Sequence, residues 1–316
     1  ISAALNAASP PCSSCHKEGR SQPRTSMAHA LELGQSDPAL ASHAKLSFRD
    51  GAYSYVIERR TFTVSDGAGA VAVPIKWAFG ANSQTYVLEY QGKLYESRVS
   101  YYPNIDALDL TMGDQDTHPR TLVEAMGREL SNGEARACFG CHATNAVAND
   151  QVRLDALTPG VQCAHCHAGA DAHRQAIAQG KVGSIPAKLS RLSAEDMANF
   201  CGQCHRSFAE VVRNRLFGPV NVRFQPYRLT ESKCFNGSDK RISCVACHDP
   251  HVEVVGEETS YDPKCQACHG VDAPVCRVAK SQCASCHMPK VDLAGAHQTF
   301  TDHYIRVVRK GEGYPE

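Results

Sequence analysis

The pattern C-x-x-C-H occurs seven times in the 316-residue chain and uses fourteen of its sixteen cysteines. The motifs, numbered 1 to 7 in chain order, begin at Cys12, Cys138, Cys163, Cys201, Cys244, Cys265 and Cys283. Their starts are 126, 25, 38, 43, 21 and 18 residues apart. This irregular spacing excludes a solenoid, whose repeats have a fixed length. The pattern therefore indicates seven local sites of one chemical kind.

Two cysteines three positions apart and a histidine directly after them suit the covalent attachment of a c-type haem. The thiols form thioethers with two vinyl groups at one porphyrin edge, and the histidine binds the iron on the proximal side. Zinc ribbons combine C-x-x-C pairs without a trailing histidine, and a thioredoxin-type site needs one such pair beside a βαβ pattern. A disulfide framework would not place a histidine after every second cysteine. We therefore expect seven covalently attached haem c groups.

Each motif assigns two kinds of residue to its haem. The predicted thioether anchors are Cys12, Cys15, Cys138, Cys141, Cys163, Cys166, Cys201, Cys204, Cys244, Cys247, Cys265, Cys268, Cys283 and Cys286. The predicted proximal iron ligands are His16, His142, His167, His205, His248, His269 and His287. No motif carries lysine in place of its histidine, so the C-x-x-C-K mark of nitrite reductases is absent.

Eight of the fifteen histidines lie outside the proximal positions. A second imidazole saturates the iron and lowers its reduction potential relative to methionine ligation, and the supply of spare histidines nearly matches seven irons. The predicted distal ligands are His29, His43, His118, His173, His251, His297 and His303. His165 lies between its own motif's cysteines, where it has little freedom to reach the iron, and is the histidine in excess. Met27 competes with His29 for one distal position.

Two cysteines, Cys234 and Cys276, lie outside the motifs. In an oxidising compartment two leftover cysteines most simply pair with each other. We predict a disulfide between them, with two buried free thiols as the alternative.

Composition excludes some partners and indicates a compartment. Lys plus Arg and Asp plus Glu number 33 each, so no basic surface argues for nucleic acid. No apolar run reaches the roughly 18 residues expected of a transmembrane helix. The cysteine content and the haem maturation route predict an extracytoplasmic protein, periplasmic or extracellular. The opening "ISAALNAASPPC" is interpreted as a mature form whose signal peptide has been removed.

Residues 46–112 contain no motif and differ from the rest of the chain. Their apolar and polar residues alternate between the turn signals "RDG", "SDGAG" and "QGK", which predicts an antiparallel sheet of five or six strands. The stretch "PRTLVEAMGREL" after His118 predicts a helix. Only 7% of the residues are aromatic, so we expect haems to fill much of the interior.

The predicted fold is therefore that of a multihaem cytochrome c: a mostly irregular, short α-helical chain wrapped around stacked haems, with an inserted antiparallel β subdomain. The predicted segments are residues 1–45 with the first haem, 46–112 as the β subdomain, and 113–316 with haems 2–7.

Several stretches, in this order, resemble a known family: "TSMAHAL", "QTYVLEYQGKLYESRVSYY", "ACFGCHATNAV", "GVQCAHCHAGADAH", "FCGQCHRS", "ISCVACHDPH" and "CASCHMPK…HQTFTDHYIR". They look like exported bacterial multihaem cytochromes related to the cytochrome c-554 type, some of whose relatives carry tetratricopeptide repeats. The resemblance covers nearly the whole chain and implies electron transfer. The family's Gly-Pro-Gly after the third motif is replaced by Ala168-Gly169-Ala170, while His173 stands in the matching ligand position.

The first functional hypothesis is an electron carrier or conduit with mostly bis-His, low-spin haems, because closely spaced haems pass electrons and saturated irons leave no room for a substrate. Its partners would be redox proteins or other copies of itself, as in a homo-oligomer or extracellular filament. The alternative is an oxidoreductase in which one open haem acts on a small nitrogen or sulfur oxyanion. A scaffold subunit of a membrane redox complex is a third hypothesis.

Overall fold

The computed structural model describes residues 10–181, 185–186, 188–237, 241–270, 276, 278–309 and 311–315. The chain divides into two compact units, residues 1–187 and 188–316, and each is described by itself. Motifs 1 to 3 belong to the first unit and motifs 4 to 7 to the second. The segment boundaries predicted after residues 45 and 112 stay predictions. The signal-peptide interpretation concerns residues 1–9, which lie outside the described residues.

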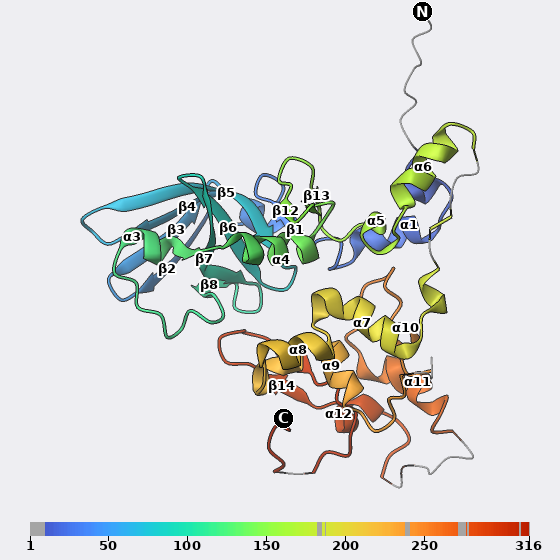
Figure 1. The fold of residues 1–316 in the computed structure, drawn as a ribbon. Coiled ribbons are helices and arrows are strands. Elements are labelled where there is room, and N and C mark those ends of the chain that lie inside the picture. The colour runs from blue at the N-terminus through green and yellow to red at the C-terminus, as the bar shows by residue number, and fades with distance from the viewer. Residues whose placement is uncertain are drawn as a thin grey trace, which may run out of the picture. The chain divides into compact units, whose positions relative to one another are not determined.

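The first unit is built around one antiparallel sheet of nine strands (Figure 1). The strands are β1 (Leu31–Leu33), β2 (Lys45–Asp50), β3 (Tyr53–Glu58), β4 (Thr61–Ser65), β5 (Ala70–Phe79), β6 (Gln84–Tyr90), β7 (Lys93–Tyr102), β8 (Ala107–Leu110) and β9 (Gly127–Glu129). Strands β2 to β8 pair in sequence order, β1 pairs with β5, and β9 pairs with β7. The ends of the path, β2 and β8, contact each other, so the sheet is nearly closed into a barrel.

The alternation seen in the sequence decides which face of the sheet is buried. Tyr55, Phe62 and Val64 are fully buried in the main hydrophobic core, while the residues between them along their strands are partly exposed. The turn between β6 and β7 has positive φ at both Gln91 (49°) and Gly92 (76°). This is the backbone that a two-residue hairpin requires, and the hairpin predicted at "QGK" is confirmed.

The predicted fold class is wrong. Strand accounts for 24% and helix for 33% of the structure, so the chain is not mainly short helices and loops wrapped around haems. The antiparallel sheet predicted within 46–112 is present, with seven strands (β2 to β8) rather than five or six, and β1 and β9 join it from outside that segment. The sheet is thus the centre of the first unit rather than an insertion. Three-residue strands such as β1, paired through Leu31 with Phe79, are too short to show a period in the sequence.

The helix predicted over residues 119–130 is also wrong in its extent. Helix α3 covers only Leu122–Met126, and the chain continues as β9. A side chain at Gly127 would place its Cβ 2.0 Å from the carbonyl oxygen of Glu96 on β7. Glycine therefore allows the close backbone pairing that ends the helix and adds a strand.

Short elements complete the first unit. The helices are η1 (Cys12–Ser14), α1 (Glu18–Ser21), η2 (Gln22–Arg24), α2 (Pro38–Ser42), α4 (Asn132–His142), α5 (Cys163–Cys166) and α6 (Ala170–Ala178). Strands β10 (Ala143–Thr144) and β13 (Thr158–Pro159) pair with each other, as do β11 (Val147–Ala148) and β12 (Gln151–Val152).

Among the described residues of the second unit, the regular elements are helices and one hairpin. They are η3 (Leu189–Arg191), α7 (Ala194–His205), α8 (Phe208–Asn214), η4 (Pro219–Arg223), α9 (Gln225–Thr230), α10 (Cys244–Cys247), η5 (Glu258–Tyr261), α11 (Asp262–Gln266), α12 (Cys283–His287), β14 (Lys290–Asp292) and β15 (Thr299–Thr301). Its buried apolar side chains are few, among them Met197, Val211, Val222 and Tyr227. Arg228 and Asp302 are also fully buried, which makes the centre of this unit partly ionic.

Candidate haem sites

Every motif contains a helical turn or ends a helix. Motifs 1, 3, 5 and 7 coincide with η1, α5, α10 and α12, motifs 2 and 4 end α4 and α7, and motif 6 begins within α11. At 3.6 residues per turn, positions i, i+3 and i+4 share one face of a helix. Both cysteines and the histidine of a motif can therefore reach one haem. The backbone N–H of His248 donates to the carbonyl of Cys244 at 2.9 Å, and motifs 1, 3 and 6 repeat this bond.

Two proximal histidines are held in the tautomer that iron requires. Nδ1 of His142 donates to the carbonyl oxygen of Ala30, and Nδ1 of His287 donates to that of Arg306, each at 2.8 Å. A carbonyl oxygen can only accept, so Nδ1 carries the proton and the lone pair lies on Nε2. An imidazole oriented in this way is the usual arrangement of a metal-ligating histidine. These residues therefore fit an axial haem ligand.

The first cysteines of six of the seven motifs lie close together in three pairs. The thiol of Cys163 lies close enough to that of Cys12 to shift its pKa, and the same holds for Cys244 with Cys201 and for Cys265 with Cys283. Thioether formation removes the thiol hydrogen, but the proximity of the sulfur atoms does not depend on it. Haems attached at such neighbouring sulfurs would lie next to each other. The pairs are motifs 1 and 3, 4 and 5, and 6 and 7.

A buried carboxylate joins motifs 6 and 7. Asp262, at the start of α11, accepts hydrogen bonds from the backbone N–H of Gln282 at 2.7 Å and of Cys283 at 2.8 Å. These backbone hydrogen bonds lower the pKa of Asp262. Gln282 has a φ of 58°, so the turn before α12 uses a conformation that non-glycine residues rarely adopt. The carboxylate thus fixes the start of motif 7 beside motif 6.

Motif 2 is held by aromatic packing. Phe139, inside the motif, is fully buried and meets Trp77 and Phe79 of β5 edge to face, with ring centres 5.3 and 5.0 Å apart. Helix α4 begins with a capping box, in which the Ser131 hydroxyl accepts from Glu134 N–H and the Glu134 carboxylate accepts from Ser131 N–H. The sheet therefore positions His142 through the helix that carries it.

His303 lies close to a proximal histidine. The ring centres of His248 and His303 are 6.2 Å apart. Nδ1 of His303 donates to the carbonyl oxygen of Thr301 at 3.0 Å. Burial lowers the pKa of His303 to about 4, so the imidazole is neutral near pH 7 and can act as a ligand. Burial also lowers the pKa of His205. A positive charge on His205 would lower the pKa of His303 further.

The other predicted distal ligands have varied surroundings. Nδ1 of His29 contacts Glu32 Oε1 at 2.5 Å, and Nδ1 of His251 contacts Asp249 Oδ1 at 2.9 Å. His173, on α6, has a buried Nδ1 for which the described residues offer no hydrogen-bond partner. His297 has a φ of 50°, and His118 is exposed. Their assignment as distal ligands stays a prediction.

His43 uses both ring nitrogens in contacts with the protein. Nδ1 donates to the carbonyl oxygen of Ala39 at 2.8 Å, and Nε2 contacts Asp106 Oδ1 at 2.9 Å. The Tyr101 hydroxyl donates to the same carboxylate oxygen at 2.7 Å. Iron ligation by His43 would require one of these bonds to break, so this arrangement argues against a distal role.

Two further predictions concern His165 and the pair Cys234 and Cys276. Burial lowers the pKa of His165, which is half-buried, and its place as the histidine in excess stays a prediction. Cys234 and Cys276 are free, exposed thiols in the structure. Their disulfide stays a prediction.

Sequence reasoning missed the supporting residues Asp262, Arg228 and Asp302. The positions of two of them carried a signal: Asp262 lies three residues before Cys265, and Asp302 directly precedes His303. Arg228 has no comparable mark, because nothing in the pattern pairs it with a residue 74 positions away. Within the described ranges, no helix has the length and apolar character needed to cross a membrane.

The comparisons with known proteins agree with the motifs. A family model described as cytochrome c554 and c-prime matches residues 111–168, which include motifs 2 and 3. The solved structure of the outer cell wall cytochrome OcwA has a similar fold, with a TM-score of 0.56 and 13% identity over 94% of this chain and 79% of OcwA. No curated protein sequence matches the chain. The family match and the shared fold support a multihaem c-type cytochrome with covalently bound haem.

Proposed function

We propose that the chain is a heptahaem c-type cytochrome that transfers electrons along closely spaced, mostly bis-His, low-spin haems. The observation that carries this proposal is the closeness of three pairs of motif cysteines: Cys12 and Cys163, Cys201 and Cys244, and Cys265 and Cys283. Covalent anchors that lie close together bring the attached redox groups into adjacent positions. The protein's part is to hold these positions and to tune potentials through axial ligands and their hydrogen bonds.

The seven proposed haems use the fourteen motif cysteines as anchors and the seven motif histidines as proximal ligands. The Nδ1 bonds of His142 and His287 to backbone carbonyls support this role. For the distal side we propose His29, His118, His173, His251, His297 and His303. A second imidazole on an iron excludes a substrate from that position, which favours electron transfer over catalysis.

The proposed location is outside the cytoplasm, periplasmic or extracellular. Covalent haem attachment and a cysteine-rich sequence support it. The fold neighbour OcwA, described as an outer cell wall cytochrome, is consistent with it. The proposed partners are redox proteins or further copies of the chain, with a filament or conduit as the larger assembly, and not nucleic acid.

A second candidate function is an oxidoreductase with one open haem. The observation that favours it is the engagement of both nitrogens of His43. With His43 and His165 set aside, six of the eight spare histidines remain for seven irons. Unless Met27 binds the seventh, one iron is open to a small nitrogen or sulfur oxyanion.

Two measurements on the purified, oxidised holoprotein test these proposals. Mass spectrometry should give the polypeptide mass plus seven haems, and a Cys12→Ser/Cys15→Ser variant should lose one of them. EPR and visible spectra should be dominated by low-spin haem. Fewer than seven haems would contradict the count. A high-spin haem that binds nitrite, hydroxylamine or cyanide would contradict a pure electron-transfer function and support the oxidoreductase.

A further inference from the structure

Building on the proposed haem sites, we propose that His303 and His248 are the two axial ligands of one iron, that of motif 5, and that the buried Arg228–Asp302 ion pair holds His303 in place. The spacing of motifs along the chain does not show which distal histidine serves which haem. The assignment comes from the geometry of the second unit.

The separation of the two rings matches a shared metal. Metal–imidazole bonds are about 2.0 to 2.1 Å long, and a ring centre lies about 1.1 Å behind its bonding nitrogen, so two axial imidazoles have centres roughly 6.3 Å apart. The ring centres of His248 and His303 are 6.2 Å apart, with ring planes inclined by 41°. This distance is too long for stacking contact between two five-membered rings and suits one iron between them.

The tautomers of both rings agree with this assignment. The Thr301 carbonyl accepts from Nδ1 of His303, so the lone pair of that ring is on Nε2. The Tyr261 hydroxyl donates to the carbonyl of Val255 at 3.0 Å and so presents its oxygen lone pair to Nδ1 of His248 at 3.4 Å. His248 therefore also keeps its proton on Nδ1. Both Nε2 atoms carry the lone pair that a metal needs.

The neighbouring histidines are weaker partners. His205 lies within electrostatic range of His303, and the Gln225 side chain lies beside it. His251 follows His248 by three residues, and its Nδ1 is turned toward Asp249 in its own loop. His303 is the histidine whose ring centre lies at ligand-pair distance from that of His248.

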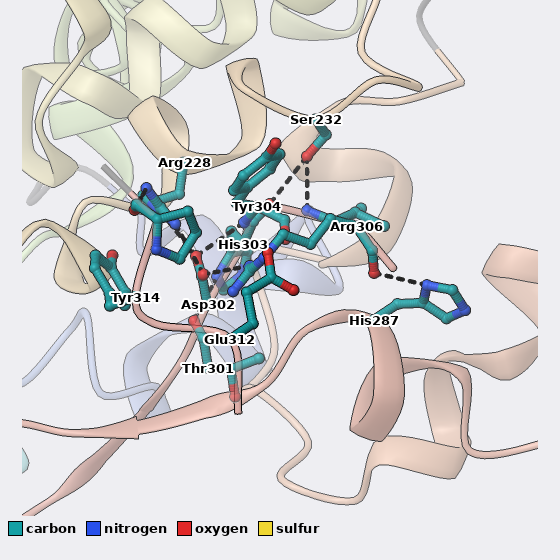
Figure 2. Close-up of polar contacts among 12 residues, drawn as sticks. Arg228, Ser232, His287, Thr301, Asp302, His303, Tyr304, Arg306, Glu312 and Tyr314 are labelled. Carbon is teal, nitrogen blue, oxygen red and sulfur yellow. Dashed lines mark hydrogen bonds and ion pairs between the residues drawn. The ribbon is translucent and has the colours of Figure 1, made fainter. Parts of the chain in front are cut away.

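The chain on both sides of His303 is fixed by buried polar contacts (Figure 2). Asp302 accepts from Nε and Nη2 of Arg228 at 2.8 and 2.9 Å, and from Nη1 of Arg306 at 2.7 Å. The Ser232 hydroxyl donates to the His303 carbonyl at 3.2 Å and accepts from the Ile305 N–H at 2.8 Å. A buried ion pair is a poor source of net stability but a strong constraint on geometry. Arg228 and Asp302 are therefore positioning residues for the ligand between these contacts.

The same contacts reach a second axial ligand. Arg306, which binds Asp302, donates its backbone N–H to the His287 carbonyl at 3.1 Å and accepts from Nδ1 of His287 at 2.8 Å. Figure 2 shows His287 attached to the cluster through this residue. Disturbing Asp302 should therefore affect the haems of motifs 5 and 7 more than the others.

The test of the ligand pair uses spin state with haem count as the control. His303→Ala should keep seven covalent haems by mass spectrometry and convert one low-spin EPR signal to high-spin. In a Cys244→Ser/Cys247→Ser background, which lacks the motif 5 haem, adding His303→Ala should produce no new high-spin signal. A new high-spin haem in that background would assign His303 to another iron and overturn the pair. Fewer than seven haems in the wild-type protein would instead contradict the heptahaem proposal and leave the ligand pair to be judged by the spin state alone.

A structure of the wild-type holoprotein is a second test that does not depend on a variant folding. One iron bonded to Nε2 of both His248 and His303 is expected, and Nε2 of His303 on the motif 4 iron would overturn the proposal. For the positioning role, Arg228→Met should shift the low-spin EPR signal or the potential of the motif 5 haem, and Arg228→Lys should restore it in part. The exposed Arg213→Met is the matched control. Wild-type spectra and potentials in Arg228→Met would remove Arg228 from this role.

Discussion

Asp302 and Arg228 form a bidentate ion pair in which neither side chain is exposed to solvent. The guanidinium also lies over two tyrosine rings, 5.2 Å from the centre of Tyr304 and 4.7 Å from that of Tyr314. Tyr314 lies near the end of the chain, and Arg228 also donates to the Pro315 carbonyl at 3.1 Å. The pair therefore ties helix α9 to the C-terminal segment of the second unit.

Removing one partner of this pair should cost much more than removing both. Asp302→Asn leaves a buried guanidinium without its counter-charge, which costs about 3–5 kcal/mol, whereas apolar replacement of a whole buried pair is often close to neutral. We expect Arg228→Met/Asp302→Leu to recover part of the loss of the single variant; the part not recovered reflects Arg306, which also loses its carboxylate partner. Guanidinium chloride unfolding of the holoprotein followed by circular dichroism measures the shift. Equal midpoints for the single and double variants would contradict the prediction.

His43 should be dispensable for haem ligation. Because Ala39 and Asp106 engage both ring nitrogens, His43→Ala should leave the oxidised EPR spectrum unchanged. It should lower stability by about 1 kcal/mol per lost hydrogen bond. His303→Ala, which should create a high-spin haem, is the positive control. A high-spin signal in His43→Ala would restore the distal role predicted from the sequence.

The motifs were readable from the sequence because their chemistry is local. Both anchors and the proximal ligand of a haem fall within five residues, so no knowledge of the fold is needed to place them. The distal side is different, since His248 and His303 are 55 positions apart and only the folded chain brings them together. Counting histidines could not distinguish His43 from a ligand, because the contact of its Nε2 with Asp106 is visible only in the structure.

The sheet was predicted in kind but not in extent. Alternation is visible in long strands such as β5 and β7, and turns such as Gln91–Gly92 carry their own signal. Strands β1 and β9 have three residues each, and their place in the sheet depends on partners far along the chain. The change from α3 to β9 at Gly127 depends on a close backbone approach that has no local pattern.

The capping box of α4 should make the stability of the first unit depend on pH. Hydrogen bonds from Ser131, then the contact with Arg128, lower the pKa of Glu134 to about 2 from an ordinary value of 4.5. A depressed carboxyl pKa stabilises the fold above the unfolded pKa, and this contribution is lost as pH falls from about 4.5 toward 2. The difference between wild type and Glu134→Gln in thermal unfolding should be constant above pH 5 and shrink below it. A difference that does not change between pH 6 and pH 3 would contradict this.

The serine of the same box gives a separate prediction. Ser131→Ala removes the hydroxyl that accepts from Glu134 N–H and should destabilise α4 by about 1 kcal/mol. Ser131→Thr retains the hydroxyl that accepts from Glu134 N–H and donates to the Glu134 carboxylate, and it should cost less. Because α4 carries motif 2 at its end, the loss should appear in the unfolding midpoint and not in the number of haems. Haem loss in Ser131→Ala would show that the cap is needed for attachment.

Asp262 should control how motifs 6 and 7 are held together. Its carboxylate accepts from the N–H groups of Gln282 and Cys283, and no neutral side chain of similar size offers two such acceptors. Asp262→Asn keeps one acceptor oxygen and Asp262→Ala keeps none, so the unfolding midpoint should fall in the order wild type, Asn, Ala. Glu231→Gln, at an exposed carboxylate of the same unit, is the control for loss of charge alone. Because the bond fixes the start of α12 beside Cys265, the Ala variant should also shift the potentials of the motif 6 and motif 7 haems while leaving the others unchanged. Potentials that match the wild type in all seven steps would mean that the cysteine contact, and not the carboxylate, sets the spacing of this pair.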